Sequence, residues 1–292
     1  MKTNLLIQSL AGAALATCVG KAQAQNMTVG GKLLLTGGVN TIEGAAGGGL
    51  TPWAVIAGYG TRDQIGGNAF VTNVRADDYQ LRVTGAAIGL YDRVEFSFAE
   101  QRFDTRDVGA TLGLGRGFTF TQKVAGAKVK LFGDAVLEQD SWIPQVSLGV
   151  MRKDNDRGDL LRALGIGNHK GTDVYLSATK LFLDPGVLVN TTLRATKANQ
   201  TGILGFGTST DSKTKLQFEG SVAYLLRRDL AIGAEFRTKP DRLAFKEDRW
   251  ADVFVAWSPT KNVSLTLAYV DLGNIVIKDR QRGSYLSLQI GF

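Results

Sequence analysis

The sequence contains a single histidine, His169, so any chemistry that needs a histidine base depends on this residue. Serine hydrolases use a histidine to activate the nucleophilic serine. His169 lies in the loop-like stretch Gly167-Asn-His-Lys-Gly171, and no serine-rich elbow lies nearby. We therefore interpret His169 as a solvated loop residue, and we predict no catalytic residue and no enzyme activity.

Two other motifs could bind a ligand. Asp154-Asn-Asp-Arg-Gly-Asp159 resembles a calcium loop, but its glycine comes one position early and no glutamate closes the site. Gly113-Leu-Gly-Arg-Gly117 lacks the preceding strand and the later acidic residue of a dinucleotide fingerprint. We interpret the first as a surface charge cluster and the second as a loop that could fold inward. The sequence thus predicts neither a metal site nor a cofactor.

Charged residues also alternate with apolar ones along stretches that are typical of β-strands. Successive side chains of a strand point to opposite faces, so these charges share one face. In a membrane barrel that face lines the interior. The charges could line a narrow pore and set its selectivity, which we slightly favour, or fill the interior with ion pairs. The predicted interior charges are Arg82, Glu95, Lys128, Lys130, Arg194, Glu219, Glu235 and Arg237.

The alternation predicts an all-β fold with about twelve strands. Most predicted strands have a length close to the roughly 9–11 residues that a tilted membrane-spanning strand needs. The content of 36 glycines and only 5 prolines also favours strands with tight turns over long helices. The predicted strands cover residues 53–60, 79–90, 93–103, 124–132, 142–152, 174–183, 187–196, 216–226, 230–238, 251–257, 263–271 and 284–292.

The connections between these strands alternate in length. A soluble β-sandwich would not require such alternation, whereas outer-membrane barrels combine short periplasmic turns with long extracellular loops. The sequence therefore predicts a transmembrane, antiparallel, up-and-down β-barrel. The short connections are 91–92, 133–141, 184–186, 228–229 and 258–262, and the long ones are 61–78, 104–123, 153–173, 197–215, 238–250 and 272–283.

The last strand reaches the end of the chain. Leu286, Leu288, Ile290 and Phe292 fall on one face, and the sequence stops on the aromatic residue. This ending resembles the C-terminal signature of bacterial outer-membrane barrels, in which the last strand pairs with the first. The resemblance implies a barrel-assembly signal in these four residues and places Phe292 at the periplasmic rim.

The N-terminal residues 1–24 are typical of a cleaved secretory signal peptide. Lys2 gives the positive end, an apolar stretch follows, and Ala22 and Ala24 form an A-x-A cleavage site. Beyond this segment no apolar run approaches the roughly 20 residues that a membrane-spanning helix requires. An exported chain of this kind is either soluble or a barrel, and the strand periodicity favours the barrel.

The predicted mature chain has two parts. Residues 25–51 are rich in glycine and suit an N-terminal arm, an extra strand or a plug, and residues 52–292 form the barrel. The formal net charge of +7 comes from basic residues scattered singly along the chain, which does not indicate nucleic-acid binding.

Three stretches of the sequence resemble one particular family of outer-membrane barrels. Gly47-Gly-Gly-Leu-Thr-Pro-Trp53, Leu164-Gly-Ile-Gly-Asn-His-Lys-Gly171 and Ser177-Ala-Thr-Lys-Leu-Phe182 resemble an uncharacterised family of proteobacterial outer-membrane barrels of unknown function. The resemblance implies a location in the Gram-negative outer membrane, contact with its lipids and lipopolysaccharide, and insertion by the barrel-assembly machinery. It implies no activity.

Three functions remain open on the sequence. The first is a narrow passive channel for ions or small polar solutes whose identity the sequence does not give. The second is a non-conducting barrel with a structural, assembly or export role. The third is an outer-membrane lipid hydrolase, whose base would have to be His169.

Overall fold

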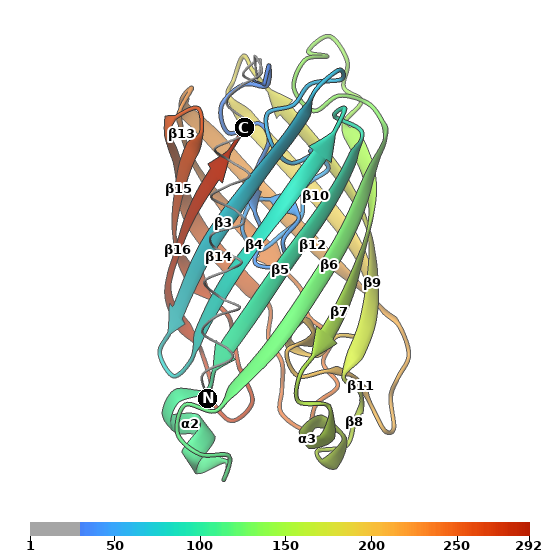
Figure 1. The fold of residues 1–292 in the computed structure, drawn as a ribbon, viewed down its shortest axis with the longest axis vertical. Coiled ribbons are helices and arrows are strands. Elements are labelled where there is room, and N and C mark those ends of the chain that lie inside the picture. The colour runs from blue at the N-terminus through green and yellow to red at the C-terminus, as the bar shows by residue number, and fades with distance from the viewer. Residues whose placement is uncertain (1–29) are drawn as a thin grey trace, which may run out of the picture.

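The computed structural model describes residues 30–292, which form a closed β-barrel (Figure 1). Twelve strands pair antiparallel in chain order, and β16 pairs with β3 to close the ring. The prediction of an up-and-down barrel is confirmed, and the predicted cleavage site at Ala22 and Ala24 lies outside the described residues. The barrel strands are β3 (Ile65–Ala76), β4 (Gln80–Leu90), β5 (Val94–Asp104), β6 (Thr119–Phe132), β7 (Gln145–Asn155), β9 (Lys170–Phe182), β10 (Val187–Thr196), β12 (Lys215–Arg227), β13 (Leu230–Arg237), β14 (Trp250–Thr260), β15 (Val263–Asp271) and β16 (Arg282–Gly291).

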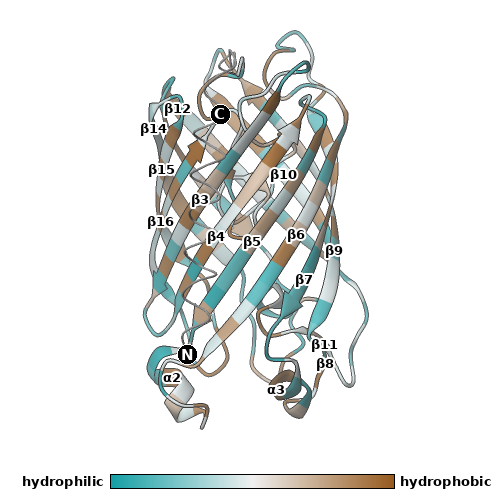
Figure 2. Cartoon of the chain, in the orientation of Figure 1, coloured by the Kyte–Doolittle hydropathy of each residue, from teal (hydrophilic) through white to brown (hydrophobic). Residues whose placement is uncertain are grey.

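The strand alternation produces an apolar outer face and a largely polar interior. Phe96 and Phe98 are half exposed on the outside of β5, whereas Glu95, the residue before Phe96, is buried inside the barrel. The side chains of β16 behave alike, since Leu286, Leu288, Ile290 and the terminal Phe292 are exposed on the outer face. Figure 2 shows the resulting change between apolar and polar residues along the strands. Such an outer face suits contact with lipid.

The barrel has two different ends. The rim that holds Phe292, called here the short-turn rim, carries tight turns such as Leu183–Gly186 and the longer connection 133–144. The opposite long-loop rim carries the longer connections and lies at the bottom of Figure 1. Within residues 30–292 no helix is long and apolar enough to cross a membrane. The small elements of the long-loop rim are α2 (Arg106–Thr111), α3 (Gly158–Ala163), β8 (Ile166–Asn168), η2 (Gln200–Gly202) and β11 (Phe206–Thr208).

The loop that follows α2 differs from our expectation. Residues 113–117 were expected to be able to fold inward, but they are exposed at the long-loop rim, and Gly113 and Gly115 face open space. Their three glycines at positive φ close a tight, solvated connection instead. The interior of the barrel is occupied by a different part of the chain.

The first barrel strand also lies elsewhere than predicted. Residues 53–60 were predicted as this strand, but they lie inside the barrel, and the first strand is β3, within the predicted loop 61–78. The alternation in 53–60 is misleading, because both faces of the stretch are buried. The glycines and asparagines of β3 interrupt its alternation of apolar and polar residues, so this strand was not predicted. The connection from β3 to β4 is therefore only Asp77–Tyr79, so the predicted alternation of loop lengths fails there.

Residues 30–64, called here the inner segment, enter at the short-turn rim and turn inside the barrel, where they are blue in Figure 1. A short hairpin of β1 (Val39–Asn40) and β2 (Ala46–Gly47) forms the innermost part. Every residue from 39 to 60 is buried. Because buried backbone groups need hydrogen-bond partners, the turns of the segment and the barrel wall have to supply them.

Candidate functional site in the barrel interior

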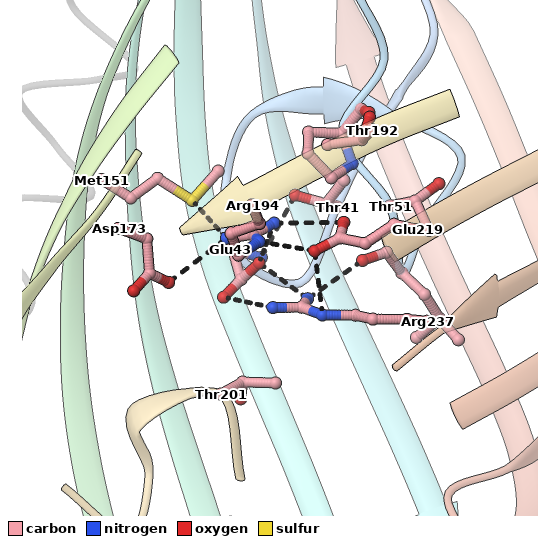
Figure 3. Close-up of polar contacts among 12 residues, drawn as sticks. Thr41, Glu43, Thr51, Met151, Asp173, Thr192, Arg194, Thr201, Glu219 and Arg237 are labelled. Carbon is pink, nitrogen blue, oxygen red and sulfur yellow. Dashed lines mark hydrogen bonds and ion pairs between the residues drawn. The ribbon is translucent and has the colours of Figure 1, made fainter. Parts of the chain in front are cut away.

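Glu43 lies in the turn between β1 and β2 and holds the inner segment to three cations of the wall. Its carboxylate lies 3.1 Å from Arg194 of β10 and 2.8 Å from Arg237 of β13. Figure 3 shows these three residues together inside the barrel. It also pairs with Lys153 of β7. The side chains of these four residues are at most 4% exposed. The contacts therefore form a buried ionic connection between the inner segment and the wall.

Two further carboxylates complete this group, called here the central ion cluster. Asp173 of β9 lies 2.6 Å from Lys153 and 3.3 Å from Arg194. Glu219 of β12 accepts hydrogen bonds from Arg194 and lies 3.3 Å from Arg237. The cluster contains three carboxylates and three cations, so its formal charge sums to zero. Buried ions are tolerated when each is paired and hydrogen-bonded, and removing one partner leaves an uncompensated charge.

A second connection joins Glu95 and Lys128 to the backbone of the inner segment. The two side chains lie 3.0 Å apart and are fully buried. Glu95 accepts hydrogen bonds from the backbone N–H groups of Ala46 and Ala57, and Lys128 donates to the carbonyl oxygens of Ala46 and Trp53. This ion pair therefore also provides hydrogen-bond partners for both arms of the inner segment.

A third connection uses Glu235 of β13. Its carboxylate accepts hydrogen bonds from the backbone N–H groups of Leu50 at 2.7 Å and Thr51 at 3.3 Å, and from two hydroxyl groups, those of Thr51 and Ser221. None of these donors carries a charge. Glu235 also lies directly opposite Asp252 of β14 in the strand register.

Neutral polar side chains of the wall form hydrogen bonds with further backbone groups of the inner segment. Gln101 donates to the carbonyl oxygen of Ile42, and Gln145 and Ser147 donate to that of Ala54. The inward-facing polar residues therefore act as partners for a buried chain, which is the role that water would otherwise have.

Seven of the eight predicted interior charges lie inside the barrel, and they fall into several groups. Six belong to the three connections above, and Lys130 pairs with Asp92 at 2.9 Å near the short-turn rim. The placement of Arg82 was wrong. It is exposed on the outer face of β4, because its neighbours Leu81 and Val83 point inward, and it lies opposite Arg102 near the long-loop rim.

Three members of the central ion cluster were not predicted from the sequence. Glu43 is the one charged residue in a stretch of small and polar residues, with no period to assign it to a face. Lys153 and Asp173 fell at the ends of a predicted loop, although they belong to β7 and β9. Extending the alternation of these two strands by a few residues would have placed both side chains inside.

The spaces around the inner segment differ in size. A cavity of about 10 Å³ adjoins Arg194, Glu219 and Arg237, which is hardly room for one water molecule. A larger cavity of about 410 Å³ opens at the short-turn rim, where Lys32 and Asp134 line it. Around the central ion cluster the interior is therefore filled by protein.

Some ionisable groups outside the strands have perturbed pKa values, at both rims. At the short-turn rim burial opposes the charge of Asp134, but the backbone N–H groups of Leu137 and Val136 bring its pKa below the ordinary value. At the long-loop rim burial raises the pKa of Glu247 to about 7 and lowers that of Lys239 to about 8. Lys239 also donates to the side chain of Gln200, so it connects two loops.

His169 and the calcium-loop-like stretch 154–159 lie apart from the barrel interior. His169 follows β8 at the long-loop rim, where its ring lies against Gly158. Among residues 154–159, Asp154 pairs with Lys170 at 2.8 Å and Asp159 pairs with Arg162. No group of three or more potential metal-ligating residues exists among residues 30–292. Asp154 and Asp159 thus form ion pairs with neighbouring basic residues.

A closed barrel with an apolar exterior and a polar interior defines the protein as an outer-membrane β-barrel of the Gram-negative type. The chain belongs to the family described as "Protein of unknown function (DUF3034)", whose model matches residues 36–289. The predicted membership in an uncharacterised family of outer-membrane barrels is thereby confirmed. No curated protein matches the sequence.

Several solved structures are similar to this chain at low sequence identity. The KdgM porin is 11% identical, with a TM-score of 0.52 and coverage of 77% of this chain and 99% of the porin. Outer membrane phospholipase A from Escherichia coli is 10% identical, with a TM-score of 0.45 and coverage of 77% and 92%. Acinetobacter baumannii Omp33 is 8% identical, with a TM-score of 0.45 and coverage of 80% and 100%.

Proposed function

We propose that the protein is an outer-membrane channel held closed by its inner segment, so that solute passes only when this segment leaves its site. The observation that carries the proposal is the central ion cluster, which fastens Glu43 to the wall where the interior is filled. The proposal refines the prediction of a narrow passive channel, because it adds a closed resting state.

The energetics support a stable closed state. Withdrawing Glu43 would leave three buried cations facing only two carboxylates, and breaking a buried pair costs about 3–5 kcal/mol. Shifting a population from 1:99 to 99:1 takes about 5.5 kcal/mol. Opening therefore needs a trigger of similar size, such as a ligand, a partner or a voltage that favours the displaced segment.

The similarity to the KdgM porin contributes a likeness of fold alone. A fold does not determine function, so the proposal takes from this neighbour only that such a barrel can serve as a porin. The apolar outer face suits contact with outer-membrane lipids and lipopolysaccharide, and insertion by the barrel-assembly machinery stays a prediction.

A second candidate is a permanently closed barrel with a structural or export-associated role. The observation that favours it is that Glu95, Lys128 and Glu235 add two more connections to the same segment. The two candidates differ in one respect, which is whether the wall encloses a usable pore once the segment has been removed.

Conductance in planar lipid bilayers separates the candidates. Gly37 closely approaches the backbone of Gly58, so residues 39–57 can be deleted and Gly38 joined to Gly58 without changing the path into β3. We expect rare or no steps from the wild type and steady steps from the deletion variant. Glu138→Gln, an exposed change at the short-turn rim, is the matched control and should behave as the wild type.

Either of two results would overturn the proposal. Steady, large conductance of the wild type without any trigger would contradict a closed resting state. A deletion variant that still migrates as a folded, heat-modifiable barrel but does not conduct would favour the permanently closed barrel. If the deletion prevents folding, Glu43→Gln provides the second test, with more frequent openings than the wild type expected.

A further inference from the structure

Glu235 and Asp252 form a pair of buried carboxyl groups beside the inner segment. They lie directly opposite each other on β13 and β14, and they are 3% and 7% exposed. Directly opposite residues of an antiparallel pair have Cβ atoms about 4.5–5.5 Å apart. The two carboxyl groups are therefore close neighbours inside the barrel.

No cation compensates this pair. Among residues 30–292 no lysine or arginine forms an ion pair with Glu235 or Asp252, and Oδ1 of Asp252 has no hydrogen-bond partner. Arg237, two residues along β13, directs its guanidinium to Glu43 and Glu219 instead. The pair differs in this respect from the charge-balanced central ion cluster.

The other elements around the pair do not supply a positive charge either. β16 contributes Tyr285, whose hydroxyl lies near Gly49, and β12 contributes Ser221. The inner segment contributes the backbone N–H groups of Leu50 and Thr51. The remaining cation nearby is Lys239, which lies over the ring of Trp250 and bonds to the side chain of Gln200 rather than to either carboxyl group.

Two adjacent buried carboxylates cannot both ionise cheaply, because each desolvated charge raises the cost of the other. The hydrogen bonds indicate which of the two is charged. Glu235 accepts four hydrogen bonds, two from N–H groups and two from hydroxyls, whereas Asp252 leaves one oxygen unpaired. An acceptor surrounded by donors favours the ionised form.

We propose that the pair holds a single negative charge, with the proton on Asp252, and that loss of this proton loosens the inner segment at Leu50 and Thr51. A second negative charge beside Glu235 repels the first and disturbs the carboxylate that accepts the two backbone N–H groups. The pair acts as a proton-dependent latch. This inference rests on the proposed function, since it assigns a trigger to the displacement of the inner segment.

The latch predicts opposite effects for two isosteric changes. Asp252→Asn imitates the protonated group permanently, so the inner segment should stay closed at every pH. Glu235→Gln removes the charge that attracts the N–H groups of Leu50 and Thr51, so it should favour opening at every pH. If the pair had only a structural role, both substitutions would weaken the attachment of the inner segment.

Infrared spectroscopy of the full-length protein in lipid vesicles tests the proton directly. A carboxylic acid has a carbonyl stretch that a carboxylate lacks. Glu247 has a pKa of about 7 and would add its own band at neutral pH, so all samples carry Glu247→Gln. In this background we expect the band at neutral pH, its loss when Asp252→Asn is added, and its retention when Asp140→Asn is added as an exposed control in the connection 133–144. Absence of the band in this background, or a band that survives Asp252→Asn, would overturn the inference.

Bilayer conductance at several pH values tests the latch. We expect wild-type openings to become more frequent as the pH rises, and Asp252→Asn to lose this dependence. An identical pH dependence in Asp252→Asn would refute the latch. The variant without residues 39–57 keeps the two questions separate: if it does not conduct, the proposed channel fails, while the infrared result still decides where the proton lies.

Discussion

Glu43 and Glu235 both hold the inner segment, but they do so in opposite ways. Glu43 belongs to the inner segment and inserts among three cations of the wall, where the charges sum to zero. Glu235 belongs to the wall, accepts hydrogen bonds from the inner segment, and lies beside Asp252 without a cation. The first connection depends on charge-balanced ion pairs. The second depends on a proton.

The difference assigns separate roles to the two connections. A balanced cluster of three carboxylates and three cations sets how firmly the segment is held, because each broken pair leaves a buried charge. An unbalanced pair sets when the segment is released, because one titration changes its net charge. A channel with only the first connection would stay closed, and one with only the second would open too readily.

The most disruptive change is Arg194→Met, because Arg194 contacts Glu43, Asp173 and Glu219 together. Three buried carboxylates would then face two cations, so we expect a loss of about 3–5 kcal/mol in the free energy of unfolding. Denaturant unfolding in detergent micelles measures this loss. Arg194→Lys keeps the charge without the planar fork and should lose less.

A second change in the Arg194→Met background tests whether charge balance is the cause. Adding Glu219→Gln restores two carboxylates to two cations, so the double variant should recover part of the stability. If the two losses simply add, the cluster acts through packing, and its contrast with Glu235 disappears.

Glu247 offers an intermediate case, since it is a buried acid with one cation, Lys239, acting on it. Burial raises its pKa from 4.5 to about 7, so the folded loop binds this proton more tightly than the unfolded one. The contribution to loop stability is therefore complete below about pH 4.5 and is lost as the pH rises to about 7. Hydrogen exchange of residues 238–249, corrected for the intrinsic rise of the exchange rate with pH, should become faster over this range, and Glu247→Gln should remove this additional increase. An unchanged profile in the variant would assign the effect to another group.

The barrel wall could be predicted because its physics is local. Period-two alternation places Phe96 on the outer face and its neighbour Glu95 on the inner face, and short turns separate successive strands. β3 was missed for the same reason, since glycine and asparagine at several of its positions carry no signal of facing lipid. The stretch 53–60 alternates, but a chain buried on all sides has no outward face to recognise.

The interior could not be predicted in the same way. Glu43 meets Lys153 and Arg237 across 110 and 194 residues of sequence, and no local pattern encodes such contacts. Alternation can place Arg194 and Glu219 on the inside, but it does not distinguish a pore lining from a partner for a buried segment. That distinction depends on the path of the inner segment. Its glycines allow many backbone conformations, so the sequence does not predict this path.

The smallest effect is expected at Arg82, the predicted interior charge that lies outside. Arg82→Gln changes an exposed side chain near the long-loop rim, opposite another arginine on the outer face of β5. Its effect on the free energy of unfolding should stay within about 0.5 kcal/mol, and its effect on conductance should be absent. Arg237→Gln, a change of the same type inside the central ion cluster, is the matched comparison. Equal effects of the two substitutions would mean that net charge near the pore, rather than burial among paired ions, controls the inner segment.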